Sequence, residues 1–318
     1  MSVEAYIIQH PQYKDGFDLI KSCHEAFKKG RKPKNLRIVG VSGVGKTTLL
    51  EAYRDLHSPS MIEDRSIITV LYVALPSKPI ESAICSEILY ALGDPFPYVG
   101  KVTEMRHRII ELFKKCRVEL LILDEIQHFL DRGKLKTHTA HADSLKVLMD
   151  ALDCSVILAG APRSIELFKI NTQLRGRFKK ITAFLPFSTF TENSTLSFKK
   201  LMRAMLGNSV FENANFFDDD ESLQRFFYAT DGVLRNISDL IVIAEDIAEK
   251  EKSQVLSMRI LHASFRSWIG VMSRFSKGVN PNPFSEKFEK RRLTLPGELY
   301  EPSDLDGDNH GWQEGLNG

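Results

Sequence analysis

A glycine-rich segment carries the residues with the clearest chemistry in this sequence. Residues 40–47 read Gly-Val-Ser-Gly-Val-Gly-Lys-Thr, which satisfies the spacing G-x-x-x-x-G-K-[ST]. Apolar residues precede this segment and helix-forming residues follow it, which is the strand–loop–helix context that a phosphate-binding loop requires. The glycines let backbone N–H groups curl around a phosphate, and the start of the following helix adds a favourable dipole. The pattern predicts a site for a nucleoside triphosphate rather than a chance glycine-rich turn.

Two side chains of this loop have distinct expected roles. The Lys46 ammonium can reach the β- and γ-phosphates, and the Thr47 hydroxyl can ligate Mg²⁺. The residues expected to contact the nucleotide are Gly40, Ser42, Gly43, Val44, Gly45, Lys46, Thr47 and Thr48. The expected cofactors are therefore ATP and Mg²⁺.

A second apolar run ends in two carboxylates. Residues 118–123 read Val-Glu-Leu-Leu-Ile-Leu and lead directly into Asp124 and Glu125. A buried strand that delivers carboxylates at its C-terminal end places them where ligands bind in an open α/β sheet. We expect Asp124 to hold Mg²⁺ and Glu125 to orient and polarise the attacking water. The alternative is a strand that merely ends in charged residues, which the upstream loop disfavours. The glutamate after the aspartate favours an ATPase over a GTPase switch or a small-molecule kinase.

Composition limits the kinds of partner that the chain can have. Among 318 residues, Lys plus Arg (43) exceed Asp plus Glu (41) by two, so any DNA-binding surface must be local. The four cysteines are widely spaced, which predicts buried thiols rather than a disulfide or zinc framework. The N-terminal residues lack the pattern of a signal peptide, and no apolar stretch approaches membrane-spanning length. We therefore expect a cytoplasmic protein with no membrane segment.

The order of apolar and amphipathic segments predicts an α/β fold. Strands are expected at 36–40, 67–73, 118–124, 155–160 and 180–185, with helices between them and a polar loop over 131–141. This alternation predicts a doubly wound parallel sheet. Helices alone are expected afterwards, over 191–206, 219–229, 233–250 and 257–273.

This order also predicts four domains. They are an N-terminal helical arm (1–35), a nucleotide-binding α/β domain (36–189), a helical lid (190–277) and a flexible tail (278–318). Prolines, glycines and acidic residues predict flexibility for the tail. Its apolar side chains could anchor a partner or have no role; they are Phe284, Phe288, Leu293, Leu295, Leu299, Tyr300 and Trp312.

Four motifs in this order resemble those of AAA+ ATPases. They are the glycine loop 40–47, Leu-Leu-Ile-Leu-Asp-Glu (120–125), Leu-Arg-Gly-Arg-Phe (174–178) and Gly-Val-Leu-Arg (232–235). The phrase over 118–128, together with Ala-Gly-Ala-Pro-Arg-Ser before Arg-Gly-Arg-Phe, resembles the TniB/TnsC group of transposition regulators. The resemblance covers roughly residues 10–275. It implies a P-loop AAA+ fold of the additional-strand type, followed by a small all-helical lid.

The resemblance also implies roles for two arginines. Arg177, favoured over Arg175, would project into a neighbouring subunit's nucleotide and stabilise charge on the transferring phosphoryl group. The alternative is a surface arginine paired with a carboxylate. Arg235 would contact the nucleotide from the lid, and its position near a helix N-terminus opposes the helix dipole, which favours function over an ordinary surface role.

One position departs from the pattern of such ATPases. The strand that ends at Gly160 normally supplies a polar sensor residue, and the group often has Val-Gly-Thr where this chain has Ala159-Gly160-Ala161. Arg163, Ser164 or the backbone would have to substitute for the missing side chain.

By resemblance, the protein would form a homo-oligomer, as a ring or filament, on double-stranded DNA in its ATP state. It would recruit or activate a DDE transposase, with a TniQ-type target selector as a second partner, and ATP hydrolysis would reset the assembly. The DNA contacts should be mostly phosphate contacts. The candidate groups are Lys101, Thr103, Arg106, Arg132, Lys134 and Lys136, each of which could instead be a solvated surface residue.

Three other functions fit parts of the same pattern. One is a helicase loader in the manner of IstB- or DnaC-like ATPases, and another is an ATP-gated signalling scaffold that does not bind DNA. A small-molecule kinase is the weakest of the three, because it leaves Arg177 and Arg235 unexplained and no substrate-binding insertion is evident.

Overall fold

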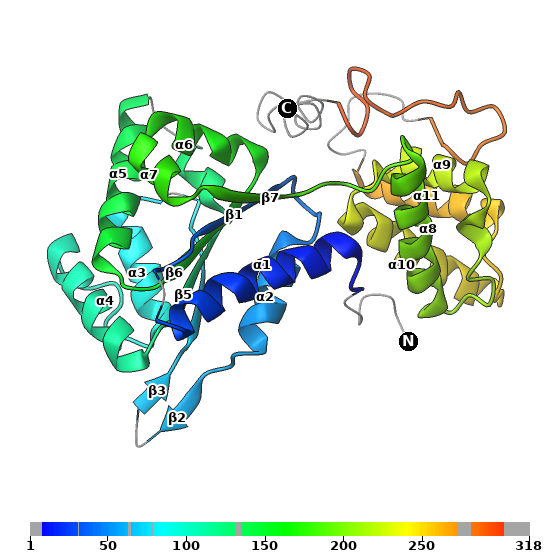
Figure 1. Ribbon diagram of the computed structural model, residues 1–318. Helices are drawn as coiled ribbons and strands as arrows, with labels where there is room; N and C mark the ends of the chain where they lie inside the picture. The colour runs from blue at the N-terminus through cyan, green and yellow to red at the C-terminus, as the bar shows by residue number, and fades with distance from the viewer. Residues whose placement is uncertain are drawn as a thin grey trace. The chain divides into compact units, whose positions relative to one another are not determined.

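Two compact units make up the described part of the chain (Figure 1). The computed structural model describes residues 8–30, 32–62, 65–77, 79–130, 135–272 and 281–301. An α/β unit contains Gln12–Ser42 and Lys46–Phe184. A helical unit contains Gly43–Gly45 and, among the other described residues, 8–11, 185–272 and 281–301.

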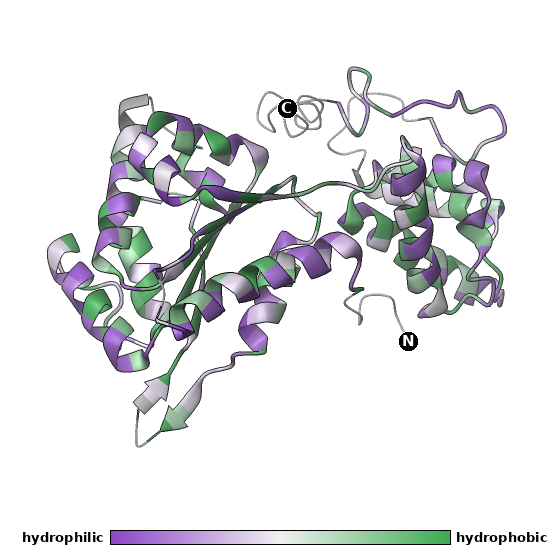
Figure 2. Ribbon diagram, in the orientation of Figure 1, coloured by the Kyte–Doolittle hydropathy of each residue, from purple (hydrophilic) through white to green (hydrophobic). Residues whose placement is uncertain are grey.

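A five-stranded parallel sheet forms the centre of the α/β unit, in the order β4-β5-β6-β1-β7. The strands are β1 (Leu36–Gly40), β4 (Val70–Ala74), β5 (Leu120–Asp124), β6 (Ser155–Gly160) and β7 (Lys180–Phe184). β5 and β6 are buried at every residue, as expected for strands covered on both faces, and Figure 2 shows hydrophobic residues along the strands. β6 pairs with both β1 and β5 and is therefore the additional strand of the predicted fold class, which is confirmed.

Helices cover both faces of this sheet (Figure 1). α1 (Pro11–Lys28) and α2 (Lys46–Asp55) lie on one face. The other face carries α3 (Glu81–Ala91), α4 (Val102–Cys116), α5 (Leu135–Ala151), α6 (Ile165–Ile170) and α7 (Thr172–Arg177). Leu121 and Leu123 of β5 belong to the apolar core under this second group, whereas Leu120 and Ile122 point to the opposite face because strand side chains alternate.

The first helix packs as part of the α/β unit rather than as a separate arm. Ile20 and Cys23 of α1 are buried. The buried His24 ring lies within hydrogen-bonding distance of Tyr53 Oη (3.0 Å) and Glu119 Oε2 (2.7 Å). Because a carboxylate only accepts, His24 Nε2 donates to Glu119 and Nδ1 accepts from Tyr53. This network connects α1 to α2 and to the chain just before β5.

Two segments differ from the sequence prediction. The run 67–73 is not one strand: β3 (Arg65–Ile67) pairs antiparallel with β2 (Ser60–Ile62), and β4 begins at Val70. The backbone turns aside between them, where the Ile68 N–H donates to the Cys116 carbonyl oxygen (2.8 Å). The polar loop predicted over 131–141 is wrong from residue 135 onward, because α5 already begins there and buries Ala142 against the sheet; residues 131–134 lie outside the described ranges.

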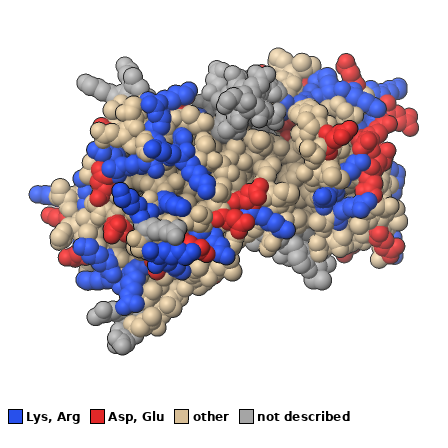
Figure 3. All heavy atoms as spheres, viewed as in Figure 1, with Lys and Arg blue, Asp and Glu red and all other residues tan. Residues whose placement is uncertain are grey.

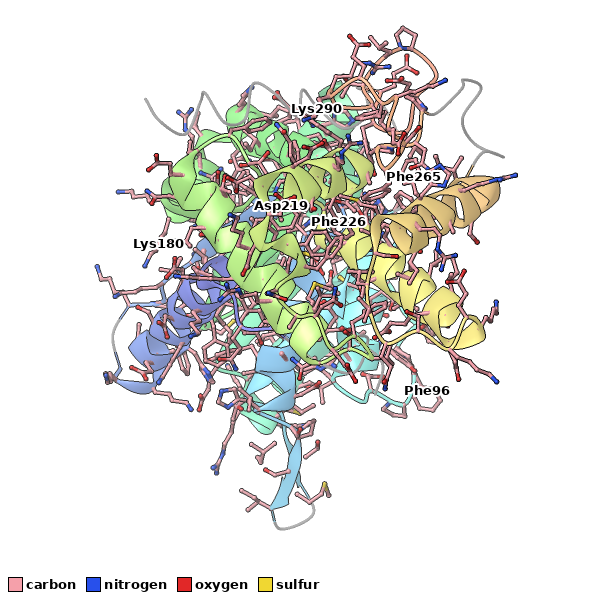
Figure 4. The ribbon with its side chains drawn as sticks, turned by 90° about the vertical axis from the view of Figure 1, so that its right-hand side faces the viewer. Phe96, Lys180, Asp219, Phe226, Phe265 and Lys290 are labelled. Carbon is pink, nitrogen blue, oxygen red and sulfur yellow. The ribbon has the colours of Figure 1, made fainter. Side chains whose placement is uncertain are left out.

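In its described residues, the helical unit contains four α-helices and a short 3₁₀ helix. They are α8 (Glu192–Gly207), η4 (Phe216–Asp218), α9 (Asp220–Thr230), α10 (Leu234–Lys250) and α11 (Met258–Met272). The four α-helices lie within one residue of the predicted bounds. Thr191 and Asp219 cap α8 and α9, because their side chains accept backbone N–H groups that the first helical turn leaves unpaired. Phe226 and Phe265 lie among the packed side chains between these helices (Figure 4).

Residues 281–301 differ from the flexible tail that composition predicts. Phe284, Phe288 and Leu293 are buried in the apolar core of the helical unit. The Arg292 guanidinium donates to both carboxylate oxygens of Asp231 (2.6 and 2.7 Å), and the Tyr300 hydroxyl donates to the Ala229 carbonyl oxygen (2.5 Å). Phe284, Phe288 and Leu293 therefore pack in the core of their own chain instead of being exposed for a partner. Trp312 lies outside the described residues.

Two expectations from composition can be compared with the fold. All four cysteines are buried free thiols, as predicted, and burial raises the pKa of Cys85 to about 11. Within the described ranges, no helix is both long and apolar enough to span a bilayer.

Candidate nucleotide-binding and hydrolysis site

The glycine loop connects the end of β1 to the start of α2. Gly43 and Gly45 have φ values of +82° and +95°, in the left-handed region where a Cβ atom is strained. Between them, Val44 is buried and anchors the loop. The motif therefore needs glycine at these two positions for backbone reasons.

The Lys46 ammonium is held against its own loop. Its Nζ atom donates hydrogen bonds to the carbonyl oxygens of Gly40 (2.7 Å) and Val41 (2.9 Å). Lys46 is also the first residue of α2, so its charge lies at the helix N-terminus, where anionic phosphate groups bind.

Sheet topology brings the predicted magnesium ligands together. The Thr47 hydroxyl donates to Asp124 Oδ2 (2.7 Å) although 77 residues separate the two. The Tyr72 hydroxyl of β4 donates to the same oxygen (3.2 Å), a contact that the sequence did not predict. Burial raises the pKa of the Asp124 carboxyl, and the Thr47 hydrogen bond partly opposes that shift.

The pair of oxygens fits a hard divalent cation. A hydroxyl and a carboxylate oxygen that meet at one point are ligand types that Mg²⁺ accepts. Thr47 and Asp124 would hold the ion, which when bound neutralises charge on the phosphate oxygens.

Glu125 follows this site in a strained backbone conformation. Its φ is +62°, which is uncommon for a residue other than glycine and is typical of functional sites. Its N–H donates to Asp124 Oδ1 (2.8 Å). The Gln127 side chain, on the 3₁₀ helix η2 (Ile126–Leu130), donates to the Glu125 carboxylate and accepts from the Ala161 N–H (2.9 Å). Sequence reasoning assigned no role to Gln127; its place two residues after Glu125 was the available signal.

The end of β6 carries no polar side chain toward this site. Ala161 begins the turn into the 3₁₀ helix η3 (Pro162–Ser164) and offers its backbone N–H. Ser164, one of the predicted substitutes, is fully buried, and its hydroxyl makes no hydrogen bond within the described chain.

Arg177 is the last residue of α7 and forms an ion pair with Asp150 of α5. Asn171 caps the start of this helix by accepting from the Leu174 N–H (2.8 Å), which fixes where the helix begins. The pairing corresponds to the surface role weighed for Arg177. The role of Arg177 between subunits stays a prediction.

Arg235 lies in the first turn of α10, as predicted. Residues 43–45 of the loop belong to the same compact unit as this helix. Within that unit the Arg235 N–H donates to the Gly43 carbonyl oxygen (2.9 Å).

The DNA-binding candidates have different surroundings. Lys101 and Thr103 are exposed at the start of α4, whereas Arg106 is half-buried and paired with Glu81. Arg132 and Lys134 lie outside the described residues, as does the side chain of Lys136. Of the three candidates whose side chains are described, Lys101 and Thr103 are the exposed ones.

The strand order, the glycine loop and the carboxylates after β5 define the AAA+ class of P-loop ATPases. The chain belongs to the TniB family: the sequence model described as "Bacterial TniB protein" matches residues 3–185. Membership implies a transposition-associated AAA+ ATPase. No curated protein matches the sequence.

Solved structures support the fold. The Aeropyrum pernix ORC1 protein, solved in complex with DNA, is 17% identical with a TM-score of 0.58; the match covers 82% of this chain and 66% of that one. The Aeropyrum pernix ORC2 protein, solved with ADPNP and ADP, is 13% identical with a TM-score of 0.59; the match covers 82% of this chain and 68% of that one. Cdc6p from Pyrobaculum aerophilum is 15% identical with a TM-score of 0.60; the match covers 82% of this chain and 69% of that one.

Proposed function

We propose that this protein is an ATP-hydrolysing regulator of DNA transposition that assembles on duplex DNA, recruits or activates a DDE transposase, and is reset by hydrolysis. The observation that carries the proposal is the Thr47–Asp124 contact (2.7 Å) beside the glycine loop, in a chain of the TniB family. It unites the phosphate-binding and hydrolytic halves of one site.

Each residue of the site has a distinct task in this proposal. When the nucleotide binds, Lys46 gives up its hydrogen bonds to the Gly40 and Val41 carbonyl oxygens and donates to phosphate oxygens instead. Its positive charge then lies where negative charge develops in the transition state. The glycine loop and the start of α2 bind the remaining phosphate oxygens. Glu125 accepts a hydrogen bond from the attacking water and orients it in line with the bond that breaks.

Two arginines complete the proposed machinery. Arg177 leaves Asp150 and reaches the nucleotide of an adjacent copy, which makes turnover depend on assembly. The exposed position of this ion pair supports the exchange, because such pairs contribute little stability and separate readily. Arg235, in the first turn of α10, contacts the nucleotide bound by its own chain.

Duplex DNA is the proposed surface for assembly, with phosphate contacts that are sensitive to salt. The face in Figure 3 supports this, because Lys and Arg side chains lie over much of the α/β unit there, with acidic side chains between them. Lys101 and Thr103 are exposed and remain candidates, as does Lys134. A TniQ-type selector is proposed as a further partner, and the expected cytoplasmic location stays a prediction.

Mixing two inactive variants tests the shared site. Arg177→Ala keeps an intact cradle and Glu125→Gln keeps an intact arginine, and both should hydrolyse ATP slowly although they bind it. In an equal mixture, about a quarter of the interfaces join an intact cradle to an intact arginine, so DNA-stimulated hydrolysis should reappear. The matched control mixes Glu125→Gln with Lys46→Ala, which both damage the cradle and should restore nothing. Full hydrolysis by a monomeric preparation, with no gain from higher concentration or added DNA, would contradict the proposal.

A further inference from the structure

Gln127 occupies the place where β6 offers no polar side chain. The strand ends in Ala159-Gly160-Ala161, and the Gln127 amide lies directly against Gly160. A Cβ atom at position 160 would lie 2.6 Å from Gln127 Oε1 and 2.8 Å from Ile126 Cγ1. Since real Cβ contacts are essentially never that short, glycine at 160 is what admits the amide.

The hydrogen bonds fix which way this amide points. The Ala161 backbone N–H can only donate, so the Gln127 atom that faces it is the carbonyl oxygen (2.9 Å). The NH₂ group is thereby directed at the Glu125 carboxylate, which can accept. Gln127 is only 7% exposed, so the carboxylate and the backbone N–H replace water as its partners.

The backbone of Glu125 makes this contact consequential. With φ at +62°, the residue stands at a strained turn, and its side chain leaves β5 in a direction that a regular strand would not give. The Gln127 NH₂ is a fixed donor to that carboxylate, and it is attached through Ala161 to the end of the neighbouring strand β6.

We propose that Gln127 is the positioning residue for Glu125 and supplies, from η2, the polar contact that β6 lacks. This inference rests on the proposed ATP hydrolysis. Gln127 holds the carboxylate at the angle from which it receives the attacking water, and Gly160 is the small residue that makes room for it. Movement of the Ala161 end of β6 therefore changes the orientation of Glu125.

Substitutions at both ends of the contact test the proposal. Gln127→Glu keeps an oxygen for the Ala161 N–H but removes the donor and places a carboxylate against Glu125. Gly160→Ala leaves Gln127 intact and pushes its amide away from β6. The matched control is Gln254→Glu, the same exchange at an exposed glutamine of the helical unit. For each variant, kcat and KM for ATP are measured with duplex DNA, with affinity for a fluorescent ATP analogue and the thermal midpoint as independent readouts.

Gln127→Glu and Gly160→Ala are expected to lower kcat by about tenfold to a hundredfold, because a misplaced catalytic group costs rate rather than binding. Affinity for the ATP analogue should match that of Gln254→Glu, whereas the thermal midpoint should fall below that of Gln254→Glu because each change crowds a buried contact. A wild-type kcat in Gln127→Glu would overturn this inference but not the proposed function. A parallel loss of ATP affinity and stability in both variants would also overturn it, because that result marks a purely structural contact. Absence of hydrolysis by the wild-type protein would overturn both the inference and the proposed function.

Discussion

Replacement of Gly232 by alanine should destabilise the helical unit by an amount that its geometry predicts. Gly232 lies between α9 and α10 with φ at +67°, and its carbonyl oxygen accepts from the Phe187 N–H (2.8 Å). A Cβ atom there would overlap the Phe187 carbonyl oxygen and lie 2.7 Å from the Phe187 carbonyl carbon. Backbone atoms cannot swing aside as a flexible side chain can, so the turn itself has to move.

Two contributions set the size of the effect. A Cβ atom in the left-handed region costs about 1–2 kcal/mol. Displacement of Phe187 adds about 1 kcal/mol for the lost hydrogen bond. The Phe187 ring also stacks on Phe198 (5.6 Å between centroids), so its movement disturbs the buried core. We expect a loss of about 3 kcal/mol in the free energy of unfolding, which is at the upper end for a single substitution.

Urea unfolding followed by tryptophan fluorescence measures this loss. Trp268 is buried in α11, and in a Trp312→Phe background it is the single tryptophan of the chain. With an m-value of about 1–3 kcal/mol/M, a loss of about 3 kcal/mol should lower the midpoint by roughly 1–3 M. Gly207→Ala is the control, because no heavy atom lies within 4 Å of a Cβ atom at that helical glycine, and it should be neutral or slightly stabilising. An unchanged midpoint in Gly232→Ala would refute the reasoning.

Two further predictions concern the α/β unit. Lys101→Glu should weaken duplex DNA binding and lower its salt dependence by about one phosphate contact, while ATP affinity stays unchanged. Gel-shift titrations at several salt concentrations measure this, with Lys114→Glu at the other end of α4 as the control. Equal effects of the two substitutions would count against a DNA contact at Lys101. His24 has a pKa lowered from 6.5, chiefly by burial, so the unfolded chain binds a proton there before the folded chain does, and stability falls as pH drops through that value. His24→Gln should be less stable than the wild type at pH 7 by about 1–2 kcal/mol, but it should lose less stability between pH 7 and pH 5. Chemical unfolding at both pH values measures this, with His107→Gln, at an exposed histidine, as the control. An unaltered dependence of stability on pH would exclude His24 as the source of the loss at low pH.

The local motifs could be predicted from the sequence because their residues are consecutive. The glycine loop over 40–47 and the adjacent Asp124 and Glu125 each follow an apolar strand, so residue order alone predicted the sheet edge where they meet. Helical periodicity likewise placed the helices of the helical unit, because it depends on neighbours within a few residues. The same reasoning could not divide the run 67–73, because both halves are equally good strand formers.

Contacts between distant segments were decided by the tertiary structure. The parallel order of β4, β5 and β6 brings Tyr72 to Asp124 and Gln127 to Ala161, and no local pattern encodes which strands become neighbours. The segment 281–301 is a stronger case: its three prolines and Gly297 hide any periodicity, yet Phe284 and Leu293 fill a core built by helices that precede it. Sequence therefore determined which residues could carry out the chemistry, whereas side-chain packing across the sheet and around the helices decided which partners hold them in place.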